Sequence, residues 1–171
     1  MKIRTDFVTN SSSSSFILAF NSDDNLDQII TDSVECFASL DSIKEYKKYK
    51  QAIITALKSS LSTQVDVDKI DDIVREEYKY LAYYDVMQKY EREHRHEDKV
   101  YTKSWKYANS EQGKKETENN IQKAIKRIKA AIKDKDLIYL VSFSDDDIIG
   151  QQLEYYILPH CDFTKGVYNH H

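Results

Sequence analysis

Glycine and proline are so scarce in this chain that they limit the folds open to it. The 171 residues contain three glycines and one proline, while 40% of them are hydrophobic. Gly113, Gly150 and Gly166 lie too far apart to build a glycine-rich phosphate loop, and all-β barrels or sandwiches need many more turn residues. A chain with this much apolar content and so few breakers is expected to form long helices.

Short apolar runs near both ends of the chain predict strands. Residues 16–20 and 137–143 are the clearest, and residues 3–8 and 166–168 are weaker candidates. Strands at both ends with helices between them predict an α+β fold, in which the N- and C-terminal segments form one small β-sheet around a large, mainly helical middle. We expect a single domain over residues 1–171, with residues 1–20 and 135–171 forming the sheet. Residues 21–134 would form the helical segment, and an inserted subdomain is one interpretation of it.

Apolar side chains at helical spacing predict five helices. Four of them span residues 26–40, 41–57, 66–94 and 116–133, and the third places Ile70, Val74 and Tyr84 on its buried stripe. Gly113 falls in a polar break before the fourth helix. The fifth helix covers residues 148–158, is capped by one of the aspartates at 145–147 and ends at Pro159.

Cysteine content and hydropathy predict a cytoplasmic protein. Cys36 and Cys161 form no metal-binding or redox motif, and a chain with so few cysteines fits a reducing compartment. No leader-like segment opens the chain, and no apolar stretch reaches the roughly 18 residues that a membrane helix needs. We therefore expect no membrane association.

Charge is divided into blocks along the helical middle. Residues 66–98 carry a net charge of −5, and residues 99–135 carry +7. Blocks of opposite sign on consecutive helices predict that the helices pair through ionic contacts.

The two ends of the chain carry a family resemblance. The opening KIRTDFVTNSSSSSF, together with an acidic turn after the last long strand, a following glutamate such as Glu154 and a terminal His170-His171, resembles a set of uncharacterised proteins from low-GC Gram-positive bacteria and their mobile elements. The resemblance implies shared ends of a fold and a bacterial or phage source, and it implies no activity. It also suggests that the histidine pair belongs to the natural chain, with a truncated purification tag as the alternative.

Aromatic residues and lysines alternate just before the basic helix. This candidate partner-binding set consists of Tyr101, Lys103, Trp105, Lys106 and Tyr107. Tyrosine and tryptophan are favoured anchors at protein interfaces, and aromatic rings with lysines also suit single-stranded nucleic acid. The competing interpretation is helix packing. A protein partner is the leading expectation, a nucleic acid is the second, and a homo-oligomer is left open.

An acidic turn near the C-terminus suggests a metal site. Asp145, Asp147, His160 and His170 would be its ligands if the terminal segments lie together, since carboxylates and imidazoles suit a divalent metal. The ordinary role of such an aspartate is to cap a helix. No other cofactor is indicated.

The serine tract at residues 11–15 allows a loop that binds a phosphate or carboxylate. The favoured alternative is a solvated loop or the polar edge of a strand.

These patterns lead to two functional hypotheses. The first is a macromolecule-binding accessory or inhibitory protein of bacterial or phage origin, which acts by occlusion through tyrosine-rich, charge-segregated helices. The alternative is a metal-dependent hydrolase acting on phosphodiesters or nucleotides. The sequence leans away from an enzyme.

Overall fold

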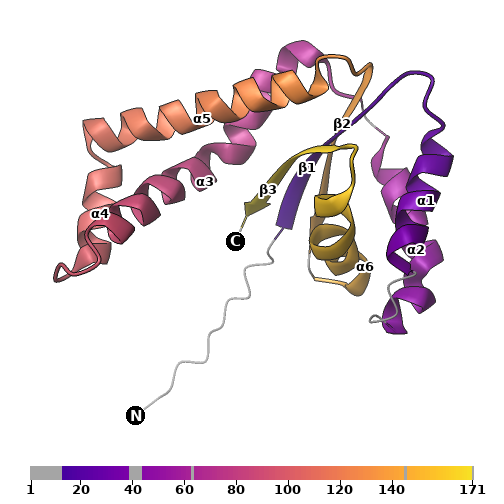
Figure 1. The fold of residues 1–171 in the computed structure, drawn as a ribbon, viewed down its shortest axis with the longest axis horizontal. Helices are drawn as coiled ribbons and strands as arrows, with labels where there is room; N and C mark the ends of the chain where they lie inside the picture. The colour runs from indigo at the N-terminus through magenta and orange to yellow at the C-terminus, as the bar shows by residue number, and fades with distance from the viewer. Residues whose placement is uncertain (1–12, 39–43, 63, 145, 171) are drawn as a thin grey trace.

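The computed structural model describes residues 13–38, 44–62, 64–144 and 146–170. Three strands from the two ends of the chain form one antiparallel sheet, and helices occupy most of the sequence between them (Figure 1). The fold is therefore α+β, as the sequence predicts. The strand predicted at residues 3–8 lies outside the described residues.

Strand β1 (Ser13–Phe20) is the centre of the sheet, between β2 (Leu137–Ser144) and β3 (Thr164–His170). Both neighbours run antiparallel to β1, and Ser13 lies opposite Ser144 on one side and His170 on the other. The prediction of a loop or strand edge is wrong for Ser13–Ser15, because these residues begin the central strand and Ser14 and Ser15 are buried.

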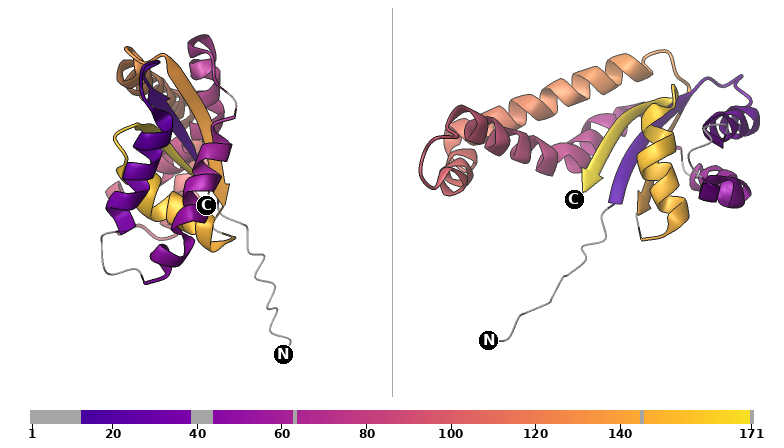
Figure 2. Two further views of the ribbon diagram at one scale, coloured as in Figure 1. Left: turned by 90° about the vertical axis from the view of Figure 1, so that its right-hand side faces the viewer. Right: turned by 60° about the horizontal axis from the view of Figure 1, so that its bottom comes forward.

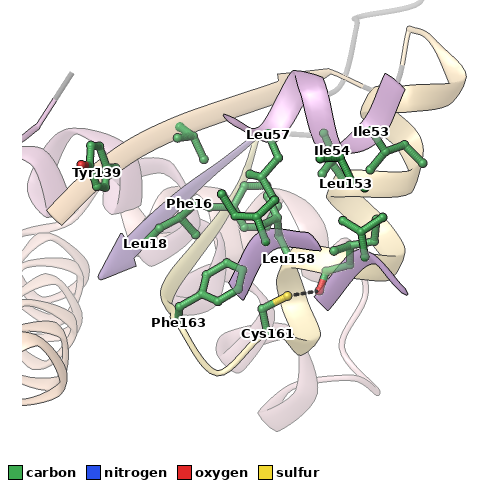
Figure 3. Close-up of a cluster of buried hydrophobic side chains, with 14 of the residues drawn as sticks. Phe16, Leu18, Ile53, Ile54, Leu57, Tyr139, Leu153, Leu158, Cys161 and Phe163 are labelled. Carbon is green, nitrogen blue, oxygen red and sulfur yellow. Dashed lines mark hydrogen bonds between the residues drawn. The ribbon is translucent and has the colours of Figure 1, made fainter. Parts of the chain in front are cut away.

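The alternation of side chains along β1 divides the core into two clusters, one on each face of the sheet. Phe16, Leu18 and Phe20 face a cluster formed with the helices α1 (Leu26–Ala38) and α2 (Lys44–Ser60) and with the C-terminal segment (Figure 3). Ile17 and Ala19 face the helices α3 (Ile70–Glu93) and α5 (Glu111–Ile132). The short helix η1 (Val67–Lys69) leads into α3.

Helices α3 and α5 extend beyond the sheet as a long antiparallel pair, with α4 (Val100–Ala108) at the far end (Figures 1 and 2). We call α3, α4 and α5 together the helical arm. Near the sheet the arm buries Ile70, Val74 and Ile128, whereas at its far end a small separate cluster of Val86, Met87 and Ala108 joins α3 to α4. The buried side of α3 therefore changes along its length. For this reason the prediction that Tyr84 is buried is wrong, and this residue is exposed.

The segment after β2 forms the predicted fifth helix, but only its start is regular. Helix α6 (Ile148–Gln151) begins at Asp147 and continues as a π-helical turn, η2 (Gln152–Ile157), and a 3₁₀ turn, η3 (Leu158–His160), which contains Pro159. Asp147 Oδ1 accepts hydrogen bonds of 2.8 Å from the backbone N–H groups of Ile149 and Gly150. The prediction that an aspartate caps this helix is confirmed.

Within the described part of the chain, no helix combines the length and the apolar composition needed to cross a membrane.

Candidate functional site: an aromatic surface at the end of the helical arm

Helix α4 presents two of the predicted partner-binding residues to solvent. Tyr101 is 67% exposed and Trp105 is 54% exposed. Because they are four residues apart on one helix, they lie on the same side of α4, one turn from each other. The chain has no other tryptophan.

Helix α3 adds two exposed tyrosines that the sequence analysis did not single out. Tyr80 is 64% exposed and Tyr84 is 49% exposed, again one helical turn apart. Their spacing of four residues is a signal in the sequence, but the apolar stripe of this helix predicts a packing role for Tyr84 instead. We call Tyr80, Tyr84, Tyr101 and Trp105 the aromatic surface.

Hydrogen bonds from Asn109 connect the α3 and α4 portions of this surface. Its side-chain nitrogen Nδ2 donates to the hydroxyl of Tyr83, at 2.7 Å, and to the backbone carbonyl of Trp105, at 2.8 Å. Beside this junction lies an open cavity of about 420 Å³, lined by Lys79, Tyr80, Tyr83, Tyr84 and Thr117. Tyr80 and Tyr84 therefore border a concave site into which a partner's side chain can fit, and Tyr101 and Trp105 do not line it.

Polar contacts fix the position of α4 against its neighbours. The buried Ser104 hydroxyl donates to Glu91 Oε1 on α3, at 2.6 Å. Gly113, near the start of α5, is so close to α4 that a Cβ atom there would lie 2.2 Å from the carbonyl oxygen of Tyr107. The prediction that Gly113 lies in a break between elements is wrong: it is a buried residue within α5.

Tyr107 belongs to the packing of the arm. It is half-buried, its ring centroid lies 5.0 Å from that of Tyr90, and its hydroxyl donates to Glu116 Oε1 at 2.5 Å. The hydrogen bond to Glu116 and burial raise the pKa of Tyr107 to about 12, so its hydroxyl remains a donor near neutral pH. Of the three predicted aromatic anchors, Tyr101 and Trp105 are available to a partner.

The two predicted lysines differ in their surroundings. Lys103 Nζ lies 2.8 Å from Glu97 Oε2, and this hydrogen-bonded contact lowers the pKa of Glu97 below its usual value. Lys106 is exposed on α4. Of these two lysines, Lys103 is paired with a carboxylate, and Lys106 has no ion pair among the described residues.

Ionic contacts join α3 to α5, but only some of them match an acid of the acidic block with a cation of the basic block, as Lys129 with Asp71 does; Arg75 with Glu118 has the opposite sense. Arg75 binds both carboxylate oxygens of Glu118, at 2.6 and 2.9 Å, and Lys129 Nζ lies 2.9 Å from Asp71 Oδ1. Exposed pairs of this kind stabilise a fold by about 0–1 kcal/mol each, so their main effect is to set the register of the two helices. Other cations are also exposed on α5, namely Lys114, Lys115, Lys123, Lys126 and Arg127, and Lys133 is exposed in the turn after it.

The structure describes the side chains of two of the four proposed metal ligands, Asp147 and His160. Asp147 caps α6, and His160 lies in η3. Asp145 falls outside the described residues, and of His170 only the backbone, at the end of β3, is described. Among the described residues, no group of three or more histidines, cysteines, aspartates and glutamates has the arrangement of a metal site. The metal site stays a prediction.

A buried polar contact joins the serine tract to the C-terminal segment. Ser14 Oγ donates to Glu154 Oε1 at 2.5 Å, and the two residues are 0% and 3% exposed. The other carboxylate oxygen, Glu154 Oε2, is buried and has no hydrogen-bond partner among the described residues. The family resemblance includes both the serine tract and this glutamate, but nothing in the sequence indicates that they touch. The contact fastens the two ends of the chain together.

Comparison of the chain with protein-family models, curated proteins and solved structures gave no match.

Proposed function

We propose that this chain is a macromolecule-binding protein that uses the aromatic surface to dock onto a protein partner. The observation that carries the proposal is the exposure of four large aromatic side chains on the helical arm, two on α4 at its far end and two in the middle of α3. Exposed aromatic side chains with a polar surround, next to a concavity, are typical of interface anchors. The expected mechanism is occlusion, in which the projecting arm covers a surface that its partner needs.

The charge around the aromatic surface favours a protein over a nucleic acid. Tyr80 and Tyr84 lie within the block at residues 66–98, whose net charge is −5. Proteins that stack bases on aromatic rings need cations beside those rings for the phosphates. Lys103 lies on α4 between Tyr101 and Trp105, but it is paired with Glu97. On α5, the exposed cations Lys123, Lys126, Arg127 and Lys129 lie farther along the arm toward the sheet, whereas Lys114 and Lys115 lie in the first turns, near α4.

The geometry of the arm suits recognition by a preformed surface. Exposed tyrosine and tryptophan bury a large area while losing few rotatable bonds, and a helical scaffold holds them in place before binding. A bacterial or phage source and an accessory or inhibitory role rest on the resemblance of the chain ends. No described contact favours the alternative of a metal-dependent hydrolase.

The test is a double variant, Tyr101→Ala with Trp105→Ala, in a quantitative pull-down from a bacterial lysate. The matched control is Tyr156→Ala, which removes an aromatic side chain that is 48% exposed in η2, outside the arm. Both changes are at the surface and should alter stability by less than about 0.5 kcal/mol each, which circular dichroism and urea unfolding check. We expect the wild type and the control to retain the same partner protein in equal amounts. The double variant should retain at least tenfold less of it.

Two outcomes would contradict the proposal. One is equal recovery of the same proteins by all three forms. The other is recovery of nucleic acid with an affinity that falls steeply with salt, which would assign the arm to nucleic acid. A labelled single-stranded oligonucleotide titrated against the unaltered protein, with the fluorescence of Trp105 as the readout, tests the second outcome directly.

A further inference from the structure

The two edges of the sheet differ in how they are covered. At the β2 edge, the backbone N–H of Val65 donates to the carbonyl of Ile138 at 2.7 Å, and Gln64 forms a bridge with Tyr139. At the β3 edge, no described segment of the chain pairs with the strand on the side away from β1. An open strand edge presents unpaired backbone groups and is a template for another strand.

A groove runs along this open edge. It has a volume of about 550 Å³ and is lined by Arg127, Ala131, Pro159, Thr164, Lys165, Gly166 and Val167, which we call the β3 groove. Helix α5 contributes one wall and η3 the other, and residues 164–167 of β3 form its floor. Val167 is exposed, so the floor is accessible at its centre.

The absence of a side chain at Gly166 lets β3 pack closely against α5 on one side of the groove. A Cβ atom at this position would lie 3.0 Å from Ile128 Cδ1 and 3.1 Å from the Tyr168 hydroxyl, which is tighter than ordinary packing allows. Next to it, Thr164 Oγ1 is a buried atom with no hydrogen-bond partner in the described part of the chain. Because this oxygen is buried, the floor offers a partner its strand edge and not the hydroxyl.

The charge of the groove selects the occupant. Arg127 and Lys165 are both cationic, and none of the described residues lining the groove carries a carboxylate. The Lys165 ammonium donates to the backbone carbonyl of Asp162, so its charge is not neutralised by this contact. Arg127 forms no ion pair with any described residue, in contrast to Arg75 and Lys129 on the same pair of helices.

We propose that the β3 groove binds an extended, acidic peptide segment of a partner protein, which adds a fourth strand to the sheet beside β3. Backbone hydrogen bonds to β3 supply sequence-independent affinity, and a carboxylate meeting Arg127 supplies selectivity. With a rise of about 3.3 Å per residue, a segment of roughly five residues covers the exposed part of the strand. This inference does not depend on the aromatic surface.

The probes are three capped heptapeptides in which valine alternates with a second residue. The first carries glutamates, the second carries lysines in their place, and the third is the glutamate peptide with N-methyl groups on alternate amides. Their binding is measured by fluorescence anisotropy of a labelled peptide, and amide hydrogen exchange of β3 shows where they bind. We expect the glutamate peptide to bind at least tenfold more tightly than either of the others and to protect the amides of residues 164–168.

Charge reversal on α5 supplies the matched pair of variants. Arg127→Glu should weaken binding of the glutamate peptide about tenfold, whereas Lys126→Glu, which makes the same charge change at an exposed neighbour outside the groove, should change it less than twofold. Circular dichroism confirms that both variants are folded.

Several results would overturn the proposal. They are equal affinities for the glutamate and lysine peptides, no loss on N-methylation, an equal effect of the two variants, and no saturable binding of any probe. Self-association through β3, detected by analytical ultracentrifugation and abolished by Arg127→Glu, would assign the groove to a second copy of this chain instead.

Discussion

Replacing Gly113 with alanine tests whether the contact between α4 and α5 sets the end of the arm. Gly113 lies in the first turn of α5, where alanine would normally be the better helix former by about 1 kcal/mol. Helix propensity alone therefore predicts that Gly113→Ala stabilises the protein. The structure predicts the opposite.

The expected cost follows from three short distances. The added Cβ would lie 2.2 Å from the Tyr107 carbonyl oxygen and 2.6 and 2.7 Å from the Cα and carbonyl oxygen of Ala108, whereas ordinary contacts begin near 3.4 Å. All three atoms belong to the backbone of α4, so no side chain can rotate away, and the helices must separate by about 1.2 Å. Overpacking of this kind costs about 1–3 kcal/mol, and with backbone on both sides we expect the upper end. After the gain in propensity, the net loss is about 2 kcal/mol, or about 4–8 °C in Tm for a chain of this size.

The assay is thermal unfolding followed by circular dichroism, together with amide hydrogen exchange along α4. Asn119→Ala is the control, because it introduces alanine at an exposed position of the same helix and should stabilise by about 0.5 kcal/mol. We expect the α4 amides to exchange faster in Gly113→Ala and to be unchanged in Asn119→Ala. If Gly113→Ala proves as stable as the control, the close approach of α4 and α5 is not what holds this part of the fold.

Two further predictions concern single polar contacts. Ser14→Ala should lower the free energy of unfolding by about 1–3 kcal/mol, because it leaves buried Glu154 without its donor. The double variant Ser14→Ala with Glu154→Leu should lose at least about 1 kcal/mol less than the sum of the two single losses. Additive losses in urea unfolding would show that the pair is not coupled. Hydrogen bonding to Arg75 lowers the pKa of Glu118 to about 2, below its ordinary value of 4.5, so its contribution to stability is complete above about pH 4.5 and is lost as the pH falls toward 2. The urea midpoint of the wild type should therefore fall more steeply between pH 5 and pH 2.5 than that of Glu118→Gln, and parallel curves would contradict this assignment.

The regular parts of the fold could be predicted because their side chains follow a simple period. Residues 137–143 became β2, and the apolar face of residues 116–133 became the buried face of α5. Both patterns indicate which face of the element is buried, and they do so without identifying the element that covers it. The joining of the chain ends into one sheet followed from the order of elements alone.

Helix α4 escaped prediction because of what it buries. Its buried residues are Ser104 and Ala108, so residues 99–107 display no stripe of large apolar side chains. The position of Gly113 was misjudged for a related reason, because the contact that requires glycine comes from another helix. The serine tract fits a loop or a strand edge from sequence alone, because the partners that satisfy its buried hydroxyls are distant in the chain: Glu154 is 140 residues from Ser14, and Ser142 is 127 residues from Ser15.

The contacts that hold α4 against α3 and α5 determine how firmly the arm presents its aromatic residues to a partner. Only a small apolar cluster joins α3 to α4, made of Val86, Met87 and Ala108, so hydrophobic burial stabilises this end weakly. The contacts of Ser104 with Glu91 and of Tyr107 with Glu116 are directional, and they fix the orientation of α4 more than they stabilise it. We therefore expect the end of the arm to open locally before the sheet does, with a free energy of opening well below that of global unfolding.

Gly113→Ala should weaken partner binding at the aromatic surface although it alters no aromatic residue, because it shifts α4 relative to α3. Unchanged binding by a variant whose α4 amides exchange faster would show that the partner does not require both helices.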